Sequence, residues 1–509
     1  MKTFLYLILL ALLMASCSKT AVLPTQFNQV SQQADIYPDY KDIVVPANIA
    51  PLNFLVRDAE ATEFVVEIAA PKSEPILVAA EADGIVQIDT LAWRQLLLSM
   101  SKQQAAEPCQ ATVRIFAHHP SGWVAYKAHT LSVAEDIDPY LSYRLIEPGY
   151  ELYRQIGLYQ RNLTSWDVHV IYENTRAFDE EHNHCINCHN YQDYSTKEML
   201  FHVRANHGGT IIVQDGKAKK IQIKADSILS AGVYPSWHPK HRWVAFSTNK
   251  TSQTFHLYHD EKIEVIDEAS DLLFYDADKN EVSNVLRTRD DFETFPCWTP
   301  QGDMLYYCSA HLPKVGMAPD SIKGPTVVAN YDSVHYNLMR IPFDEKTRQF
   351  GQPELVIDAA AQHKSISVPR LSPDGRYILY TQGDYGQFHI WHKSSDLWVK
   401  DLKTDSCYAL TEANSTDVDS YHTWSSNGRW IVFSSRRMDG NYTRPHIAYF
   451  DKQGHAHKAF CLPQEDPRHN ILLLKSYNVP ELTRDAVRIS VQDLKDCIYN
   501  TEPETAKYK

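Results

Sequence analysis

One short sequence pattern recurs four times in the C-terminal half of the chain, and this repetition constrains the fold more than any other feature. Each copy has an aromatic or apolar residue, then a turn, then a strand with alternating apolar residues. The copies align without a gap, at residues 234–247, 295–308, 368–381 and 421–434. Pro373-Asp374-Gly375-Arg376 and Ser426-Asn427-Gly428-Arg429 are predicted hairpin turns, because glycine accepts the positive φ that such turns require. The pattern therefore predicts successive small sheets, as in a β-propeller.

The Ser-Pro-Asp-Gly-Arg-Tyr-Ile element at residues 372–378 and its three relatives resemble the repeats of TolB-like propellers, a WD-like family. The resemblance implies a propeller of about five or six blades over residues 208–490, followed by a C-terminal tail at 491–509. It also implies a binding scaffold and transfers no catalytic residue, because such repeats are structural. The spacing of the copies is irregular, so long inserted loops such as 313–332 are expected on one face.

The N-terminal part is also predicted to be mostly β. Short apolar stretches between turn residues predict a β-sandwich, immunoglobulin-like in kind, at residues 42–135. One helix is expected within it, from apolar residues at helical spacing: Leu91, Trp93, Leu96, Leu97 and Met100. Residues 136–207 are rich in tyrosine and are expected to form an ordered connector that ends in a haem-binding segment.

The first residues have the pattern of an export signal. Lys2 is followed by the apolar run 4–13 and by small residues before Cys17. This arrangement resembles a bacterial lipobox, although Met14 stands where leucine is usual. The resemblance implies a signal peptide at 1–16, lipid on Cys17 as the membrane anchor, and a tether at 17–41; ordinary cleavage and secretion is the alternative. The net charge of -13 disfavours a nucleic-acid partner, since phosphates require a basic surface.

Cys185-Ile186-Asn187-Cys188-His189 has the spacing of a c-type haem attachment site. In such a site two thiols add to the haem vinyl groups, and the adjacent histidine binds the iron. We therefore expect one covalent haem c on Cys185 and Cys188. Two alternatives stay open: a redox disulfide, and a zinc site completed by His182 and His184. Neither alternative requires His189.

His189 is the expected proximal ligand of the iron. Met199 and His202 are equal candidates for the sixth ligand, with His207 behind them, although packing explains Met199 equally well. Arg204 is a candidate partner for a haem propionate. Of the remaining cysteines, Cys297 and Cys308 flank one predicted hairpin, where they would form a disulfide or stay as buried thiols.

The whole arrangement resembles exported lipoproteins of Bacteroidetes-type bacteria. It implies a cell-envelope protein, facing the periplasm or the cell surface, that acts in electron transfer or docks a protein or polymer on its propeller. A haem-dependent oxidoreductase or peroxidase-like enzyme is one alternative, and a scaffold for envelope assembly or uptake without a redox role is another. Gly-x-Ser-x-Gly and His-Glu-x-x-His are absent from the sequence, which disfavours common hydrolases. Asp417, Asp419 and His422 form a polar cluster for which a structural role is favoured over cation binding.

Overall fold

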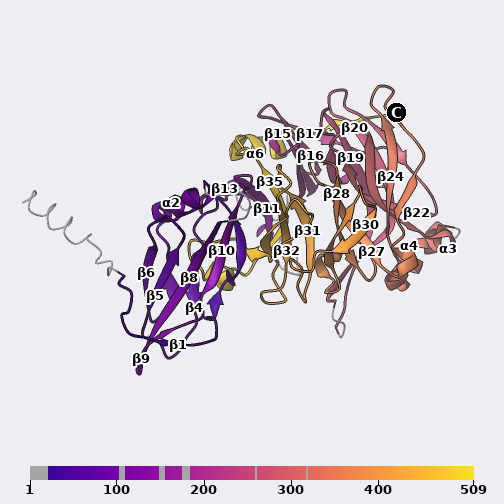
Figure 1. Cartoon of the computed structure of the whole chain (residues 1–509). Helices are drawn as coiled ribbons and strands as arrows, with labels where there is room; N and C mark the ends of the chain where they lie inside the picture. The colour runs from indigo at the N-terminus through magenta and orange to yellow at the C-terminus, as the bar shows by residue number, and fades with distance from the viewer. Residues whose placement is uncertain (1–20, 103–108, 148–154, 175–183, 258–260, 317–318) are drawn as a thin grey trace, which may run out of the picture. The chain divides into compact units, whose positions relative to one another are not determined.

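A computed structural model of the chain describes residues 21–102, 109–147, 155–174, 184–257, 261–316 and 319–509 (Figure 1). The chain forms two compact units. The first comprises residues up to 43, residues 51–133 and residues 463–468. The second comprises residues 44–50, 134–462 and 469–509. In the described part of the chain, no helix is long and apolar enough to cross a membrane.

The first unit is built from a seven-stranded and a three-stranded sheet, in agreement with the predicted β-sandwich. The larger sheet has the order β1-β9-β8-β10-β3, with β5 paired to β8 and β6 paired to β5, and the smaller has the order β2-β4-β7. Their bounds are β1 Asn28–Gln29, β2 Ile36–Tyr37, β3 Ile43–Pro46, β4 Phe54–Val56, β5 Glu63–Ala69, β6 Ile76–Glu81, β7 Ile85–Val86, β8 Cys109–His119, β9 Gly122–Ala125 and β10 His129–Ala134.

The predicted helix is α2 (Thr90–Ser101). It begins after Asp89, whose carboxylate accepts a hydrogen bond from the Ala92 amide at 2.8 Å and so caps the first turn. Trp93, Leu96, Leu97 and Met100 are buried, as the spacing indicates, whereas Leu91 is 66% exposed. The expected tether also differs from the structure, because β1 and β2 pair with β9 and β4 of the sandwich.

The second unit contains six sheets in its described residues, which we call blades 1 to 6. The strands of each blade are given from the innermost outwards. Blade 1 is β35 (Ser476–Thr483), β11 (Tyr140–Ile146), β12 (Gly157–Asn162) and β13 (Val168–Glu173). Blade 2 is β14 (His184–Gln192), β15 (Ser195–Ala205), β16 (Gly209–Gln214), β17 (Lys217–Gln222) and β36 (Glu504–Thr505). Blade 3 is β18 (Val233–Trp237), β19 (Trp243–Phe255), β20 (Ile263–Asp276), β21 (Glu281–Leu286) and β37 (Lys507–Tyr508).

The remaining three blades follow in chain order. Blade 4 is β22 (Asp291–Trp298), β23 (Met304–His311) and β24 (Asn337–Asp344), with β25 (Gln349–Phe350) and β26 (Glu354–Ile357) at its outer edge. Blade 5 is β27 (Ser365–Leu371), β28 (Tyr377–Gly383), β29 (Asp396–Asp401) and β30 (Ser406–Ala409). Blade 6 is β31 (Asp419–Trp424), β32 (Trp430–Ser435), β33 (Arg444–Tyr449) and β34 (Phe460–Cys461).

The innermost strands form a closed ring. Going round it, β35 contacts β14, and each following innermost strand contacts the next, until β31 contacts β35 again. Blade 1 closes the ring because it joins β35, from the end of the unit, to three strands from its beginning. The second unit is therefore a six-bladed β-propeller, which confirms the fold predicted from the repeats.

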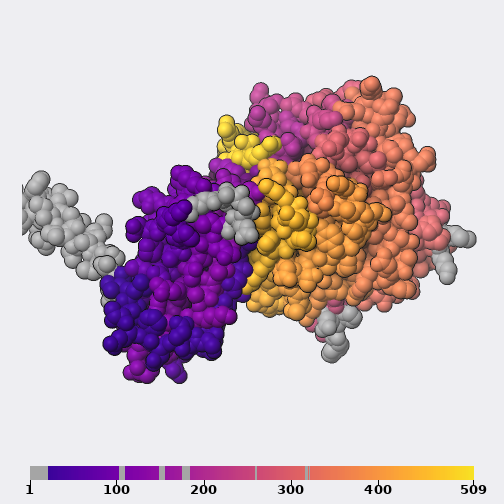
Figure 2. Space-filling model, in the orientation of Figure 1, coloured from indigo at the N-terminus to yellow at the C-terminus, as the bar shows by residue number. Residues whose placement is uncertain are grey.

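The structure differs from the predicted boundaries at both ends of the propeller. Residues 136–207, expected as a connector and haem segment, form most of blade 1 and the first two strands of blade 2. Residues 491–509, expected as a tail, form helix α6 (Val491–Asn500), which packs on β13 and β17, and the edge strands β36 and β37. Figure 2 shows these last residues in yellow on the surface of the propeller.

A bulge interrupts every innermost strand at the same place. One residue there takes a positive φ of 46 to 55°, and the register with the neighbouring strand shifts around it. These six bulge residues are Cys188, Tyr234, Phe295, Val368, Tyr421 and Val479. Four of them begin the copies found in the sequence. A bulge of this kind kinks the strand and redirects its side chains, here toward the ring axis.

The long connections lie at one end of the propeller. They join the second and third strands of blades 3, 4 and 5, and these connections leave their sheets at the same end because strands alternate in direction. That of blade 4 carries α3 (Pro313–Gly316), α4 (Asp320–Ala329) and the turn η3 (Tyr331–Ser333). This result agrees with the expectation of inserted loops on one face. Short helical turns elsewhere are η4 (Ala360–Gln362), η5 (His389–Trp391) and α5 (His469–Leu472).

Candidate cofactor site in the propeller channel

A cavity of about 690 Å³ occupies the channel at the end of the propeller that carries the long connections. All six bulge residues line it, so every blade contributes to its wall. Three of the bulge residues are aromatic, and Phe388 and Trp391 of the blade 5 connection add two more rings. The volume lies within the range of about 300–1,000 Å³ that is usual for small-molecule and cofactor sites.

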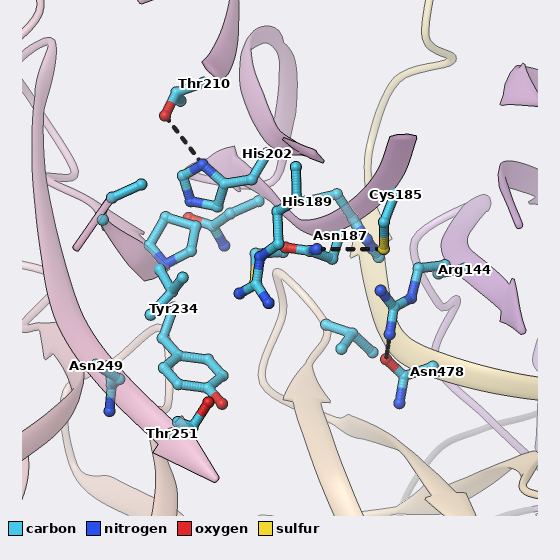
Figure 3. A pocket seen from close by; sticks show the side chains of 18 of the residues that line it. Arg144, Cys185, Asn187, His189, His202, Thr210, Tyr234, Asn249, Thr251 and Asn478 are labelled. Atoms are coloured by element: carbon cyan, nitrogen blue, oxygen red, sulfur yellow. Dashed lines mark hydrogen bonds between the residues drawn. The ribbon is translucent and has the colours of Figure 1, made fainter. Parts of the chain in front are cut away.

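The Cys-x-x-Cys-His sequence forms the blade 2 wall of this cavity. Cys185, Cys188 and His189 belong to β14, and all three line the cavity. Cys188 is the bulge residue of blade 2, with a φ of 55°. The strand is therefore kinked at Cys188 itself, between Cys185 and His189. Neither thiol forms a disulfide with another described cysteine. The Asn187 amide donates to the Cys185 sulfur at 3.7 Å (Figure 3).

His189 is a buried histidine without a fixed hydrogen bond. It is 3% exposed, and neither ring nitrogen reaches hydrogen-bond geometry, although backbone groups of Val479 and Ser142 lie beside the ring. Burial, assisted by the Arg144 cation, lowers the pKa of His189 to about 3. The imidazole is therefore neutral at physiological pH, which is the form that binds metals.

His202 lines the same cavity from β15. Its Nδ1 lies 2.9 Å from the Thr210 hydroxyl (Figure 3), whereas its Nε2 is buried and has no hydrogen-bond partner. Burial lowers the pKa of His202 to about 3, and the Arg204 cation acts in the same direction. A hydrogen bond at one ring nitrogen that leaves the other nitrogen open is the arrangement by which proteins orient a metal-binding histidine.

Met199 lies outside the cavity. It is on the same strand as His202, three residues away, and alternation along a strand places the two side chains on opposite faces. Met199 packs in an apolar cluster with Phe201 and Val203. Of the two equal candidates for a sixth ligand, the structure brings only His202 to the cavity. His207 is also elsewhere, beside the rings of Tyr499 and His184 at 4.3 and 5.9 Å.

Three arginines line the cavity, Arg144 of blade 1, Arg204 of blade 2 and Arg370 of blade 5, together with two glutamates, Glu147 and Glu481. Burial raises the pKa of Glu481 to about 8, so it is protonated at neutral pH and the wall carries a net positive charge. Arg144 donates to the Ile186 carbonyl at 3.0 Å and to Asn478 at 3.2 Å. Within the described residues, none of the three forms an ion pair with a carboxylate. The wall is thus suited to a ligand that carries negative charge.

The two alternatives for the cysteine pair, a zinc site and a disulfide, stay predictions. Among the described residues, no group of three or more His, Cys, Asp or Glu side chains is arranged to hold a metal ion. His182, the other histidine of the zinc hypothesis, lies outside the described residues, as does Cys17. No disulfide joins any two of the described cysteines, neither Cys185 to Cys188 nor the buried Cys297 to Cys308.

The sequence matches no protein-family model and no curated protein. Several solved structures are similar to the chain. TolB from Acinetobacter baumannii is 12% identical, with a TM-score of 0.42 over 77% of this chain and 85% of that chain. The β-propeller domain of the Trilobed protease from Pyrococcus furiosus is 10% identical, with a TM-score of 0.32 over 68% and 90% of the two chains. Scores of this size carry no information about activity, and the six blades themselves establish the propeller.

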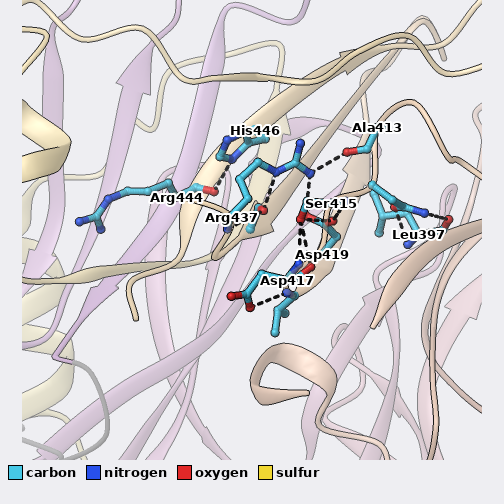
Figure 4. A network of polar contacts seen from close by, with 11 residues as sticks. Leu397, Ala413, Ser415, Asp417, Asp419, Arg437, Arg444 and His446 are labelled. Carbon is cyan, nitrogen blue, oxygen red and sulfur yellow. Dashed lines mark hydrogen bonds and ion pairs between the residues drawn. The ribbon is translucent and has the colours of Figure 1, made fainter. Parts of the chain in front are cut away.

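The polar cluster at the start of blade 6 has a structural role (Figure 4). Asp419 is fully buried and accepts hydrogen bonds from the amide and hydroxyl of Ser415, at 2.6 and 2.9 Å. Arg437 forms an ion pair with it at 2.7 Å. His422 lies within hydrogen-bond distance of the Leu379 carbonyl, in blade 5. These contacts hold the connection between blades 5 and 6.

Sequence reasoning missed Arg144 and Arg370 as members of the site. It also missed that Cys188-His189-Asn190-Tyr191 is itself a copy of the propeller repeat. The paired residues Asn187 and His202 are one position further apart along the chain than their counterparts in blade 3, so an alignment without gaps does not find this copy. An alignment that allowed one extra residue in the turn would have found it.

Proposed function

We propose that the propeller channel carries one haem c, attached through Cys185 and Cys188, and that the protein exchanges electrons with a partner protein at the cell envelope. The observation that carries the proposal is that both thiols and His189 line one cavity of cofactor size. Covalent attachment requires exactly these groups to reach the same macrocycle. The haem, when bound, supplies a centre that gains and loses one electron.

His189 and His202 are the residues that would bind the iron. Both are buried and neutral, and each has an open ring nitrogen at the cavity. Thr210 orients His202, as the partners of metal-binding histidines commonly do. Held by both imidazoles, the haem iron would supply a one-electron centre without a position open to a substrate, which suits electron transfer.

The rest of the chain is consistent with a role at the envelope. The export signal and Cys17 predict a lipid anchor, and the TolB-like repeats predict a propeller that docks other molecules. The long connection of blade 5 contributes Phe388 and Trp391 to the cavity, which lies at the end of the propeller that carries the long connections. A redox partner would therefore dock at this end, where it comes nearest to the cavity.

The test is to express the full chain, with its signal, in bacteria that carry the machinery for c-type haem attachment. We expect a Soret band and an added haem mass that survive denaturation, and a mass that also reports lipid on Cys17. Cys185→Ala/Cys188→Ala should abolish the haem. The control is Cys109→Ala/Cys407→Ala, which also removes two free thiols but lies away from the cavity and should retain the haem.

A colourless natural chain would contradict the proposal and leave the propeller as a scaffold without a redox role. A haem with an open coordination position, which binds added cyanide or carbon monoxide readily, would favour the enzyme alternative. We expect instead a low-spin spectrum that changes to high-spin in His202→Ala, because that variant removes one axial ligand.

A further inference from the structure

Arg370 lies on the opposite side of the channel from the two thiols. The thiols belong to blade 2 and Arg370 belongs to blade 5, on β27. In a closed ring of six blades, the third neighbour on either side is the blade directly across the axis. Contacts between successive innermost strands establish this order, with blades 3 and 4 on one side of the axis and blades 1 and 6 on the other.

The Arg370 guanidinium forms no ion pair in the described part of the chain, and its Nη1 donates to the Pro369 carbonyl at 3.0 Å. The Glu481 carboxyl on the same wall feels its charge, but burial raises the pKa of Glu481 to about 8, so this carboxyl is protonated at neutral pH and does not neutralise the guanidinium. An unpaired guanidinium on a cavity wall is a ready partner for an anionic group of a ligand, with which it forms charge-assisted hydrogen bonds.

The other two cations of the wall are placed differently. Arg144 is already held by the Ile186 carbonyl and Asn478. Arg204 stands on blade 2 itself, directly opposite Cys185 in the β14–β15 register, and its side chain is exposed. It therefore shares the side of the channel on which the thiols lie.

We propose that Arg370 is the residue that binds the propionate carboxylates of the haem. This inference rests on the proposed function. The vinyl groups that react with the thiols and the two propionates are at opposite edges of the macrocycle. With the vinyl edge bonded to Cys185 and Cys188 of blade 2, the propionate edge reaches across the channel to blade 5, where Arg370 is the cation that meets it.

The positions of the two histidines agree with this placement. His189 lies toward blade 1, beside the backbone of Val479 and Ser142. His202 lies toward blade 3, with its ring centre 5.7 Å from that of Phe246 on β19. The two imidazoles thus stand on the two sides of the line from blade 2 to blade 5. Axial ligands must lie on opposite sides of the macrocycle, and a haem along this line meets that condition.

The experiment compares Arg370→Gln with Arg204→Gln in the full chain. Both variants remove one unpaired cation from the same cavity wall, so loss of charge alone does not distinguish them. In Arg370→Gln, we expect a lower midpoint potential, because an unpaired propionate charge stabilises the oxidised iron, and a shifted propionate bending band in the resonance Raman spectrum. Arg370→Lys should restore much of the potential, and Arg204→Gln should change both readouts less.

Each outcome decides the inference. The haem mass of the natural chain is measured first, and its absence overturns both the proposed function and the role of Arg370. If the haem is present, the proposed function stands. Equal potentials and equal Raman bands in the natural chain and Arg370→Gln then overturn the role of Arg370 alone, as does a larger effect in Arg204→Gln. Thioether bonds retain the haem in every variant, so an unchanged haem mass shows that each variant has matured.

Discussion

Asp267 is one of the buried carboxyls that make the stability of the propeller depend on pH. It belongs to β20 and is 2% exposed. The Tyr336 hydroxyl and the Asn249 amide both donate to it at 3.0 Å. Burial nevertheless outweighs these hydrogen bonds and raises the pKa of Asp267 to about 7. Its proton is therefore retained in the folded chain at a pH at which the unfolded chain has lost it.

The first prediction follows from this difference. The pKa of this carboxyl is higher in the folded chain than in the unfolded chain. Its contribution to the free energy of unfolding is therefore fully present in acid and is lost as the pH rises from about 4 through 7. Asp267→Asn removes the titration but retains one oxygen acceptor. Between pH 5 and 7 the variant should gain stability relative to the natural chain by about 1.4 kcal/mol per pH unit. Urea unfolding at each pH measures this; Asp226→Asn, at an exposed position, should show no such gain.

At the same scale, the sequence identified four residues that the structure places on one cavity. Spacing identified Cys185, Cys188 and His189, and proximity along the chain suggested His202, all of which line the cavity. The same reasoning treated Met199 and His202 as equal candidates. The two residues lie on opposite faces of one strand, and the sequence does not show which face is turned to the cavity. Arg370 is far from the motif in sequence and is brought to it only by closure of the ring.

At the scale of elements, local sequence patterns predicted the hairpins. They predicted a blade only where its innermost strand is followed directly in the chain by its second strand. Blade 1 joins Val479 and its neighbours to strands that precede them by more than 300 positions, as the partners Ser142 and Glu481 show. No local repeat can reveal such a pair. Helix α6 was missed although its signal is local: Ser490 is a capping residue, and Leu494, Cys497 and Ile498 follow at helical spacing.

The second prediction concerns this helix. Ser490 caps α6 by accepting a hydrogen bond from the Asp493 amide at 3.0 Å, and Leu494 and Ile498 are fully buried. Leu494→Ala should lower the free energy of unfolding by about 2–5 kcal/mol, because it leaves a cavity between α6 and the blades. Gln492→Ala, on the exposed face of the same helix, should change it by less than about 0.5 kcal/mol. Equal effects of the two changes would show that α6 is not part of the folded core.

At the scale of the whole molecule, closure of the ring depends on β35, a strand near the C-terminal end of the chain. β35 pairs with β11 along its whole length and also contacts the innermost strands of blades 2 and 6. Without β35, the β11 edge would expose unpaired amides and carbonyls, and the contact between the first and last blades would be lost. Closure of this kind makes the stability of every blade depend on residues near the end of the chain.

The third prediction separates closure from the contribution of the last helix. A chain that ends after Ser490 retains β35 and should fold with a lower unfolding midpoint, because only α6 and the edge strands β36 and β37 are missing. A chain that ends after Lys475 lacks β35 and should lose its near-ultraviolet circular dichroism and its single cooperative transition, and it should aggregate through the open edge. If the shorter chain instead unfolded in one transition at the midpoint of the longer one, β35 would not be needed for the ring, and blades 2 to 6 would hold together through their mutual contacts alone.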